Sequence, residues 1–188
     1  ISPLGTDATK TITLGESGGT LQAASGVTNN LGITMADQWR LTSDITLGTG
    51  TTVLITGLER ADSRGAGQIG TAMSESSGIF SFPSTGFYFV LGQAAFNCSA
   101  NDGNLHFGIQ YTENNSSYSN TAFIQQSVNA NQRISFGAAS TSILLDITDI
   151  SNQKIKFTAG SGPSSGTVIR GNSDQNETIF NFIRLGDT

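Results

Sequence analysis

Charged side chains are scarce in this sequence. Asp, Glu, Lys and Arg make up 12% of the 188 residues, which is about half of the ~25% usual in globular domains. The nine Lys and Arg residues form no cluster, and the formal net charge is −5. The sequence therefore argues against a nucleic-acid partner, because such a partner needs a basic surface. It also argues against long solvated helices held by ion pairs.

Cysteine and long apolar segments are nearly missing as well. Cys98 is the only cysteine, so no disulfide can form within the chain, and we expect a small buried apolar residue there. No apolar run approaches the length that a membrane-spanning helix needs, which predicts that the protein does not insert into a membrane. The N-terminus has no basic segment followed by an apolar one, so no signal peptide is visible.

Residues for catalysis or metal binding are equally few. His106 is the only histidine and lies on the polar side of an expected strand, which disfavours a Ser-His-Asp triad. One His and one Cys are too few for a zinc site within one chain, although three copies of His106 around a threefold axis could hold a metal. Glu59 with Asp62, and Asp146 with Asp149, indicate solvated charges or local ion pairs rather than glycosidase carboxylates. We predict a protein that is not an enzyme, with no catalytic residues, no metal and no cofactor.

What the sequence does contain is typical of β-structure. Short alternating apolar runs are separated by Gly, Asn, Ser and Asp, and no stretch has the apolar spacing of a helix. From Trp39 onward this pattern predicts about ten strands in two packed sheets, an all-β sandwich. The expected strands are 52–55, 79–82, 87–91, 105–111, 122–128, 133–136, 143–148, 154–157, 167–170 and 178–185.

The first 36 residues differ from the rest. They hold only very short β-like pieces with few apolar side chains, so one chain cannot bury a core there, whereas three chains wound together can. We predict a short extended β-type stalk over 1–36 and a head domain over 37–188, with Trp39 packed where the two meet. A flexible tether over 1–36 is the alternative.

The segment 87–91 is apolar on both faces of its strand. Phe87, Phe89 and Leu91 point one way, while Tyr88 and Val90 point the other. A strand of this kind must be covered on both sides. The interior of the sandwich covers one face, and a neighbouring subunit is the simplest cover for the other.

The motif G-I-F-S-F-P-S-T-G-F-Y-F at 78–89 and the Phe-rich final strand at 178–185 carry a family resemblance. Together they make the head resemble the trimeric jelly-roll superfamily of complement globular heads and tumour necrosis factor. The resemblance covers about 39–188 and implies a homotrimeric jelly roll with its chain ends near one pole and target-binding loops at the other. It places eight residues in the core or the trimer interface: Phe80, Phe82, Phe87, Tyr88, Phe89, Val90, Phe180 and Phe182.

The low charge, the stalk-like N-terminus and the Ser, Thr, Asn and Gly content also resemble virion fibres of phages, particularly structural proteins of marine phages. This resemblance implies a virion or extracellular protein whose trimeric head attaches to a glycan or protein on a host surface, alongside other virion proteins. Two alternatives stay open: a decoration or structural protein that binds no receptor, and a depolymerase of surface glycans.

One polar loop, at 111–120, has a composition suited to recognition. Tyr supplies amphipathic contact area, and Asn and Ser supply adaptable hydrogen bonds. The predicted ligand-binding residues are Tyr111, Asn114, Asn115, Tyr118 and Asn120. An ordinary solvated loop is the alternative.

Overall fold

We describe the fold from a computed structural model. It describes residues 32–188 except 51, 100, 130–134 and 163–165, so residues 1–31 of the predicted stalk lie outside the described residues. These described residues form thirteen β-strands and no helix, so they include no helix long and apolar enough to cross a membrane. The prediction of an all-β protein is confirmed.

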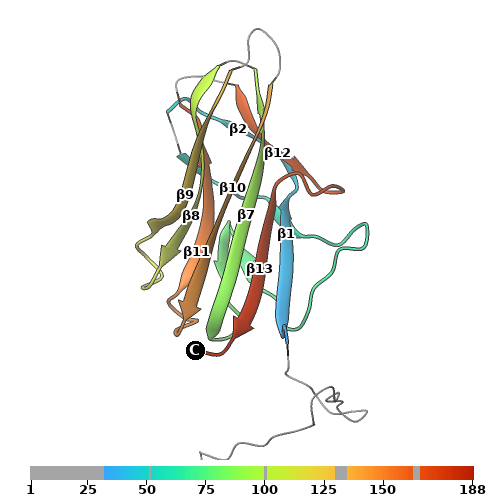
Figure 1. The fold of residues 1–188 in the computed structure, drawn as a ribbon, viewed down its shortest axis with the longest axis vertical. Helices are drawn as coiled ribbons and strands as arrows, with labels where there is room; N and C mark the ends of the chain where they lie inside the picture. Colours follow the sequence, from blue (N-terminus) through green and yellow to red (C-terminus); the bar gives the residue numbers. More distant parts are fainter. Residues whose placement is uncertain (1–31, 51, 100, 130–134, 163–165) are drawn as a thin grey trace, which may run out of the picture. The chain divides into compact units, whose positions relative to one another are not determined.

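The strands form two antiparallel sheets that pack face to face (Figure 1). The first sheet contains β1 (Met35–Leu41), β2 (Ser43–Leu47), β4 (Leu58–Arg60), β7 (Gly86–Cys98), β10 (Ser135–Ile147), β12 (Thr167–Asn172) and β13 (Ile179–Gly186). The second contains β3 (Thr52–Leu54), β5 (Ser74–Ser76), β6 (Ile79–Ser81), β8 (Asp102–Thr112), β9 (Ser119–Val128) and β11 (Lys154–Gly160).

The strand count differs from the expected ten for two reasons. One long strand, β10, contains 135–136 of the strand predicted at 133–136 and 143–147 of the strand predicted at 143–148, and it pairs with β7 along its whole length. Four further strands, β1, β2, β4 and β5, were not among the ten. Three of these four, β2, β4 and β5, have only three to five residues, which is too few to show apolar alternation. They are strands because β2 pairs with β12, β4 with β1 and β5 with β6.

The first sheet is built around β7. On one edge β7 pairs with β10, and on the other it pairs with β13 and β12. Its side chains alternate as the sequence predicts. Tyr88 and Val90 point into the sandwich and are fully buried, whereas Phe87, Phe89 and Leu91 point away from it.

Aromatic rings from both sheets meet in the interior. Phe157 of the second sheet lies with its ring centroid 4.3 Å from that of Phe180 in the first, and Phe80 lies 4.8 Å from Phe182. Offset and tilted contacts of this kind add to the stabilisation from buried apolar area. Trp39 joins this cluster, 5.3 Å from Phe80, so it is a core residue in the middle of β1 rather than a residue at the start of the head.

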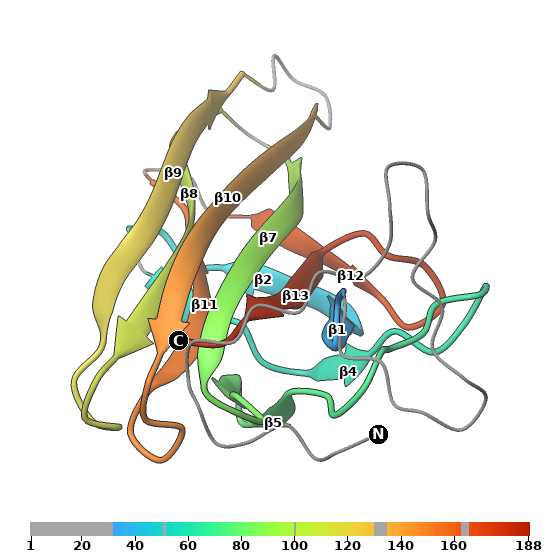
Figure 2. The same cartoon turned by 60° about the horizontal axis from the view of Figure 1, so that its bottom comes forward.

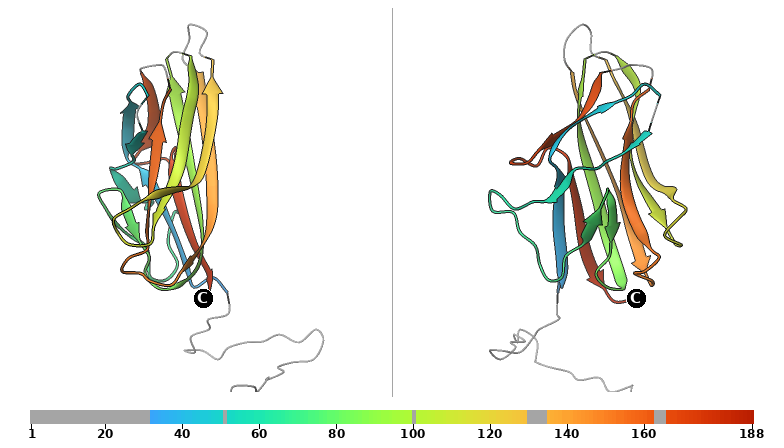
Figure 3. Two further views of the ribbon diagram at one scale, coloured as in Figure 1. Left: turned by 90° about the vertical axis from the view of Figure 1, so that its left-hand side faces the viewer. Right: turned by 180° about the vertical axis from the view of Figure 1, so that it is seen from behind.

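The beginning of β1 and the end of β13 are neighbours, because Met35 pairs with Arg184. Met35 and Ala36 thus belong to the sheet, while the division into stalk and head stays a prediction. Three connections lie at this same end, at 82–85, 113–118 and 148–153 (Figures 1 and 3). Along the side of the sandwich β9 and β10 run together, one from each sheet (Figure 2).

Candidate functional site

The outward face of the first sheet is apolar at its centre. Leu144 of β10, Phe89 of β7 and Ile183 of β13 occupy paired positions on three adjacent strands, and so form one row across the sheet. Leu144 is 58% exposed, and Phe87, in the next outward position of β7, is 37% exposed. We call Phe87, Phe89, Leu91, Leu144 and Ile183 the apolar face. Since the described part of the chain leaves these side chains partly open to water, the apolar face is a candidate interaction surface.

Sequence reasoning found only part of this surface. It identified Phe87, Phe89 and Leu91 as one face of their strand but missed the role of Leu144 and Ile183. The signal was present, because both lie in expected strands where every second residue shares a face. Register between the strands was needed to bring them beside Phe89.

The six other residues predicted for the core or the trimer interface lie inside this chain. Each is no more than 3% exposed, and each contributes to the single buried cluster between the sheets: Phe80, Phe82, Tyr88, Val90, Phe180 and Phe182. These residues therefore pack in the core between the two sheets.

A groove of about 400 Å³ runs along the apolar face toward β1. Phe89, Leu91 and Ile183 line one part of it, and Gln38 and Asn181 line another. The amide of Gln38 donates a 2.6 Å hydrogen bond to Asn181 Oδ1, which closes a polar border at this edge. The groove is therefore apolar beside Phe89, Leu91 and Ile183 and polar beside Gln38 and Asn181.

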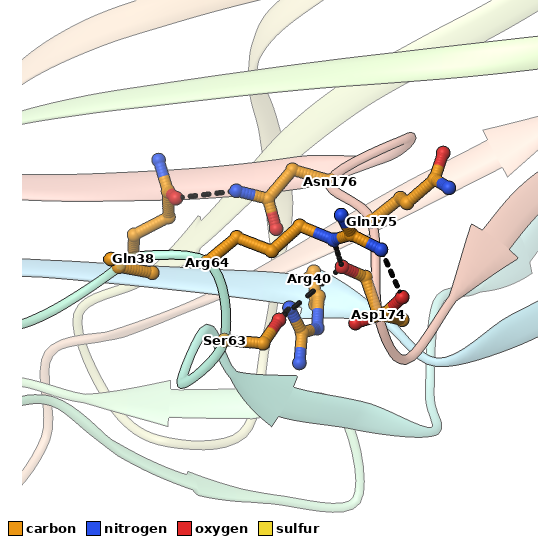
Figure 4. Close-up of a pocket in the computed structure, with 9 residues that line it drawn as sticks. Gln38, Arg40, Ser63, Arg64, Asp174, Gln175 and Asn176 are labelled. Carbon is orange, nitrogen blue, oxygen red and sulfur yellow. Dashed lines mark hydrogen bonds and ion pairs between the residues drawn. The ribbon is translucent and has the colours of Figure 1, made fainter.

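A polar cavity of about 660 Å³ adjoins the same border (Figure 4). It lies between the connection that follows β4 and the connection between β12 and β13. Arg64 reaches across and forms an ion pair with Asp174, which is far away in the sequence, while Asn176 Nδ2 donates to Gln38 Oε1 at 2.8 Å. Arg64 also has a positive φ of 56°, which is uncommon for a residue with a Cβ.

Arg40 forms the floor of this cavity. Its guanidinium is almost fully buried and pairs with Glu59 and Asp62, both at 2.7 Å, and donates to Ser63 Oγ at 2.8 Å. The two carboxylates expected to be solvated or locally paired are thus bound to Arg40, which comes from another strand. No local sequence pattern indicated this, because β1 and β4 become neighbours only in the sheet.

Arg60 has a separate buried partner. The Asp37 carboxylate accepts hydrogen bonds from Arg60 Nε at 2.9 Å, from Trp39 Nε1 at 2.8 Å and from the Met73 backbone at 3.0 Å. The Arg60 guanidinium also lies 4.7 Å from the Trp39 ring centroid. These hydrogen bonds compensate the buried Asp37 carboxylate for its lost hydration. They also hold Arg60 in place, directly before the loop that borders the polar cavity.

The five residues predicted to bind a ligand have mixed positions. Asn114 and Asn115 are exposed, and Asn114 Oδ1 accepts bonds from the backbone of Ser116 and Ser117, which shapes the turn. Asn120 is exposed in β9, where its Oδ1 accepts a bond from Gln110.

The two predicted tyrosines are only partly accessible. The Tyr111 hydroxyl accepts a 2.6 Å bond from Gln153 while its ring packs on the core, and burial raises its pKa. Burial also raises the pKa of Tyr118, whose ring centroid lies 4.2 Å from the Lys156 ammonium.

The loop 111–120 also lies at the same end as Met35 and Gly186. The sequence resemblance instead implies that target-binding loops lie at the pole away from the chain ends. The loop predicted to bind a ligand and the loops that the resemblance implies for target binding therefore lie at opposite ends of the head. Ligand binding by the loop 111–120 stays a prediction.

His106 lies on the outward face of the second sheet, not on the apolar face. Its Nε2 is 2.8 Å from Thr52 Oγ1, and its ring centroid is 5.3 Å from that of Phe123. Within the described part of the chain no three His, Cys, Asp or Glu residues are grouped as metal ligands.

Solved structures from the tumour necrosis factor family have a similar arrangement of strands. Murine APRIL at pH 5.0 superposes with a TM-score of 0.59 at 9% identity, over 80% of this chain and 98% of that chain. Eiger TNF from S. frugiperda gives a TM-score of 0.58 at 10% identity, over 84% of this chain and 94% of that chain. The chain has a tumour-necrosis-factor-like jelly-roll fold. Neither a protein-family model nor a curated protein matches the sequence.

A likeness at this level of identity concerns the fold alone. The resemblance to the tumour necrosis factor superfamily is confirmed for the fold, whereas the resemblance to phage fibres has no support from these comparisons. The absence of enzymatic activity and the homotrimeric state stay predictions.

Proposed function

We propose that this chain forms the homotrimeric head of a virion fibre, which attaches to a ligand on a host surface. The observation that carries the proposal is the row of Leu144, Phe89 and Ile183 on the outward side of the first sheet. Identical subunits arranged around an axis can cover this apolar face in every copy at once. A tumour-necrosis-factor-like jelly roll is the fold in which the sequence resemblance implies such a trimer.

Attachment follows from the trimer by effective concentration. Three identical weak sites on one head, repeated over several fibres, bind a surface carrying many ligand copies far more firmly than one site does. The low charge of the chain supports a ligand recognised through hydrogen bonds and apolar contact rather than through charge alone.

Sedimentation velocity of the full chain tests the assembly. We expect one species of three times the 19.6 kDa chain mass over a wide concentration range. A monodisperse monomer of 19.6 kDa would contradict the proposal.

Attachment needs its own measurement, because a trimer alone is also expected of a decoration protein. The labelled full chain is incubated with a panel of bacterial isolates, and we expect saturable binding to some of them. A stable trimer that binds none of the isolates contradicts the attachment function. Release of reducing ends from the polysaccharide of a bound isolate would instead identify a depolymerase.

A further inference from the structure

The outward face of β8 and β9 in the second sheet has a chemistry unlike that of the apolar face. Side chains on this side alternate with those that enter the core. The outward residues combine one exposed aromatic ring with two amide pairs: Asn104, His106, Gly108 and Gln110 on β8, and Asn120, Phe123 and Gln125 on β9.

Phe123 is the exposed aromatic side chain at the centre of this face. It is 44% exposed and pairs across the strands with Gly108. A Cβ atom at position 108 would lie 3.1 Å from Phe123 Cδ2, so the ring lies close to the backbone of β8 where that glycine has no side chain. His106 adjoins the ring at a centroid distance of 5.3 Å and is held in turn by Thr52.

Amide pairs lie on both sides of Phe123 along the strands. Gln110 Nε2 donates to Asn120 Oδ1 at 2.8 Å, and Gln125 Nε2 donates to Asn104 Oδ1 at 2.7 Å. The first pair presents the Gln110 carbonyl oxygen and the Asn120 amide N–H to solvent, since both side chains have further hydrogen-bonding capacity. The mutual bonds orient these groups before any ligand arrives, which lowers the entropy cost of binding.

Formal charge is nearly missing from this face. Residues 103–112 and 119–128 contain no Asp, Glu, Lys or Arg. The neighbouring Lys156 ammonium is placed over the Tyr118 ring at 4.2 Å. A cationic ligand would give up hydration here without gaining an opposite charge. The one ammonium beside Gln110, that of Lys156, already lies over the Tyr118 ring, so the chemistry favours a neutral ligand.

We propose that this face binds a neutral saccharide, with one pyranose ring stacked on Phe123 and its hydroxyl groups bonded to the flanking amides. The C–H side of a pyranose is apolar and flat, and its hydroxyls radiate from the edge, where the Gln110–Asn120 and Gln125–Asn104 pairs lie. The inference rests on the proposed attachment function and names the ligand class for it. It also gives Asn120, one of the predicted ligand residues, a place in a defined surface.

An array of immobilised neutral oligosaccharides built from glucose, galactose, mannose and N-acetylglucosamine tests the inference with the full chain. We expect binding to at least one of them. Phe123→Ala should weaken that binding at least about tenfold, whereas Phe123→Tyr should stay within about threefold. The control Ile150→Ala removes another exposed apolar side chain, 40% exposed and outside this face, and should leave binding unchanged.

Gly108→Ala provides a variant that keeps the aromatic ring. The new methyl group would lie 3.1 Å from Phe123 and 3.3 Å from the Ala122 carbonyl oxygen, so we expect the ring to tilt and binding to fall. Circular dichroism and sedimentation confirm that each variant keeps the fold and assembly of the parent chain. Binding to none of the oligosaccharides, or equal binding by folded Phe123→Ala, would overturn the inference.

Intact cells separate this inference from the proposed function. If parent protein and Phe123→Ala bind an isolate equally, or if protease but not periodate treatment of the cells removes binding, the saccharide site is wrong and attachment stands. If the parent protein binds oligosaccharides but no isolate, attachment to bacterial cells is wrong and the saccharide site stands.

Discussion

Gly92 in β7 lies beneath the ring of Phe107 in β8, so closely that a Cβ atom at position 92 would lie 2.6 Å from Phe107 Cζ. Phe107 is fully buried and stacks against Phe157, with ring planes 9° apart. The two sheets therefore approach each other at this point because one of them has no side chain there.

Gly92→Ala should overpack this contact. Because the neighbouring rings are themselves buried, we expect the free energy of unfolding to fall by ~1–3 kcal/mol. Chemical denaturation measures the change. Gly103→Ala is the matched control, since a Cβ atom at 103 meets nothing within 4 Å. Equal stability of the two variants would contradict the close packing at Gly92.

Leu144→Asp should dissociate the proposed trimer. A carboxylate in the middle of the apolar face would be buried without a partner when subunits associate, which is strongly unfavourable. Sedimentation velocity should show monomers that keep the circular dichroism spectrum of the parent chain. Ile150→Asp, at an exposed apolar side chain in the connection between β10 and β11, should stay trimeric. Trimers of Leu144→Asp would show that the apolar face is not the subunit contact.

Asp37→Ala should be strongly destabilising. The buried carboxylate has three kinds of donor, and its loss leaves the Trp39 N–H and the Arg60 guanidinium without it. We expect a loss of ~3 kcal/mol in the free energy of unfolding, measured by chemical denaturation. The control Asp187→Ala removes a 91% exposed partner of Arg184 and should change stability by less than ~1 kcal/mol.

Asp149 should titrate below the ordinary range of an aspartate. A hydrogen bond from the Asn152 side chain is the main cause of its lowered pKa, followed by one from the Ser151 backbone. The folded state therefore binds this proton less tightly than the unfolded chain. The stabilising contribution is fully present above the unfolded pKa of ~3.9 and is lost as the pH falls through the folded pKa.

An NMR titration of the Asp149 carboxyl carbon measures this effect. Asn152→Ala should raise the pKa toward its usual value, and Lys154→Gln should raise it less, since charge attraction from Lys154 is the smallest cause. An unchanged pKa in Asn152→Ala would contradict the assignment.

Much of the fold could be predicted from the sequence because alternation is a local property. The apolar alternation in β7, the Phe-rich β13 and the polar connections between strands each follow from neighbouring residues. For the same reason the two faces of β7 were assigned correctly, since successive side chains in a strand must point to opposite sides.

Pairings between distant segments could not be predicted in this way. Arg40 binds Glu59 and Asp62 because β1 lies beside β4, and Arg64 reaches Asp174 from a distant part of the sequence. The merging of two expected strands into β10 has the same origin. The Gly and Ser residues in its middle have weak strand propensity, and pairing with β7 overrides it.

By itself, the sequence determined the class of structure, the division of side chains between the two faces of the main strands, and the scarcity of groups for metal or acid–base chemistry. Only the tertiary structure decided which outward residues share a surface, such as Leu144 with Phe89 and Phe123 with the flanking amides. The physical reason is that successive side chains within one strand point to opposite faces of the sheet, which is a local property of the sequence. Neighbours across a sheet depend instead on register, which the packing of the whole core selects.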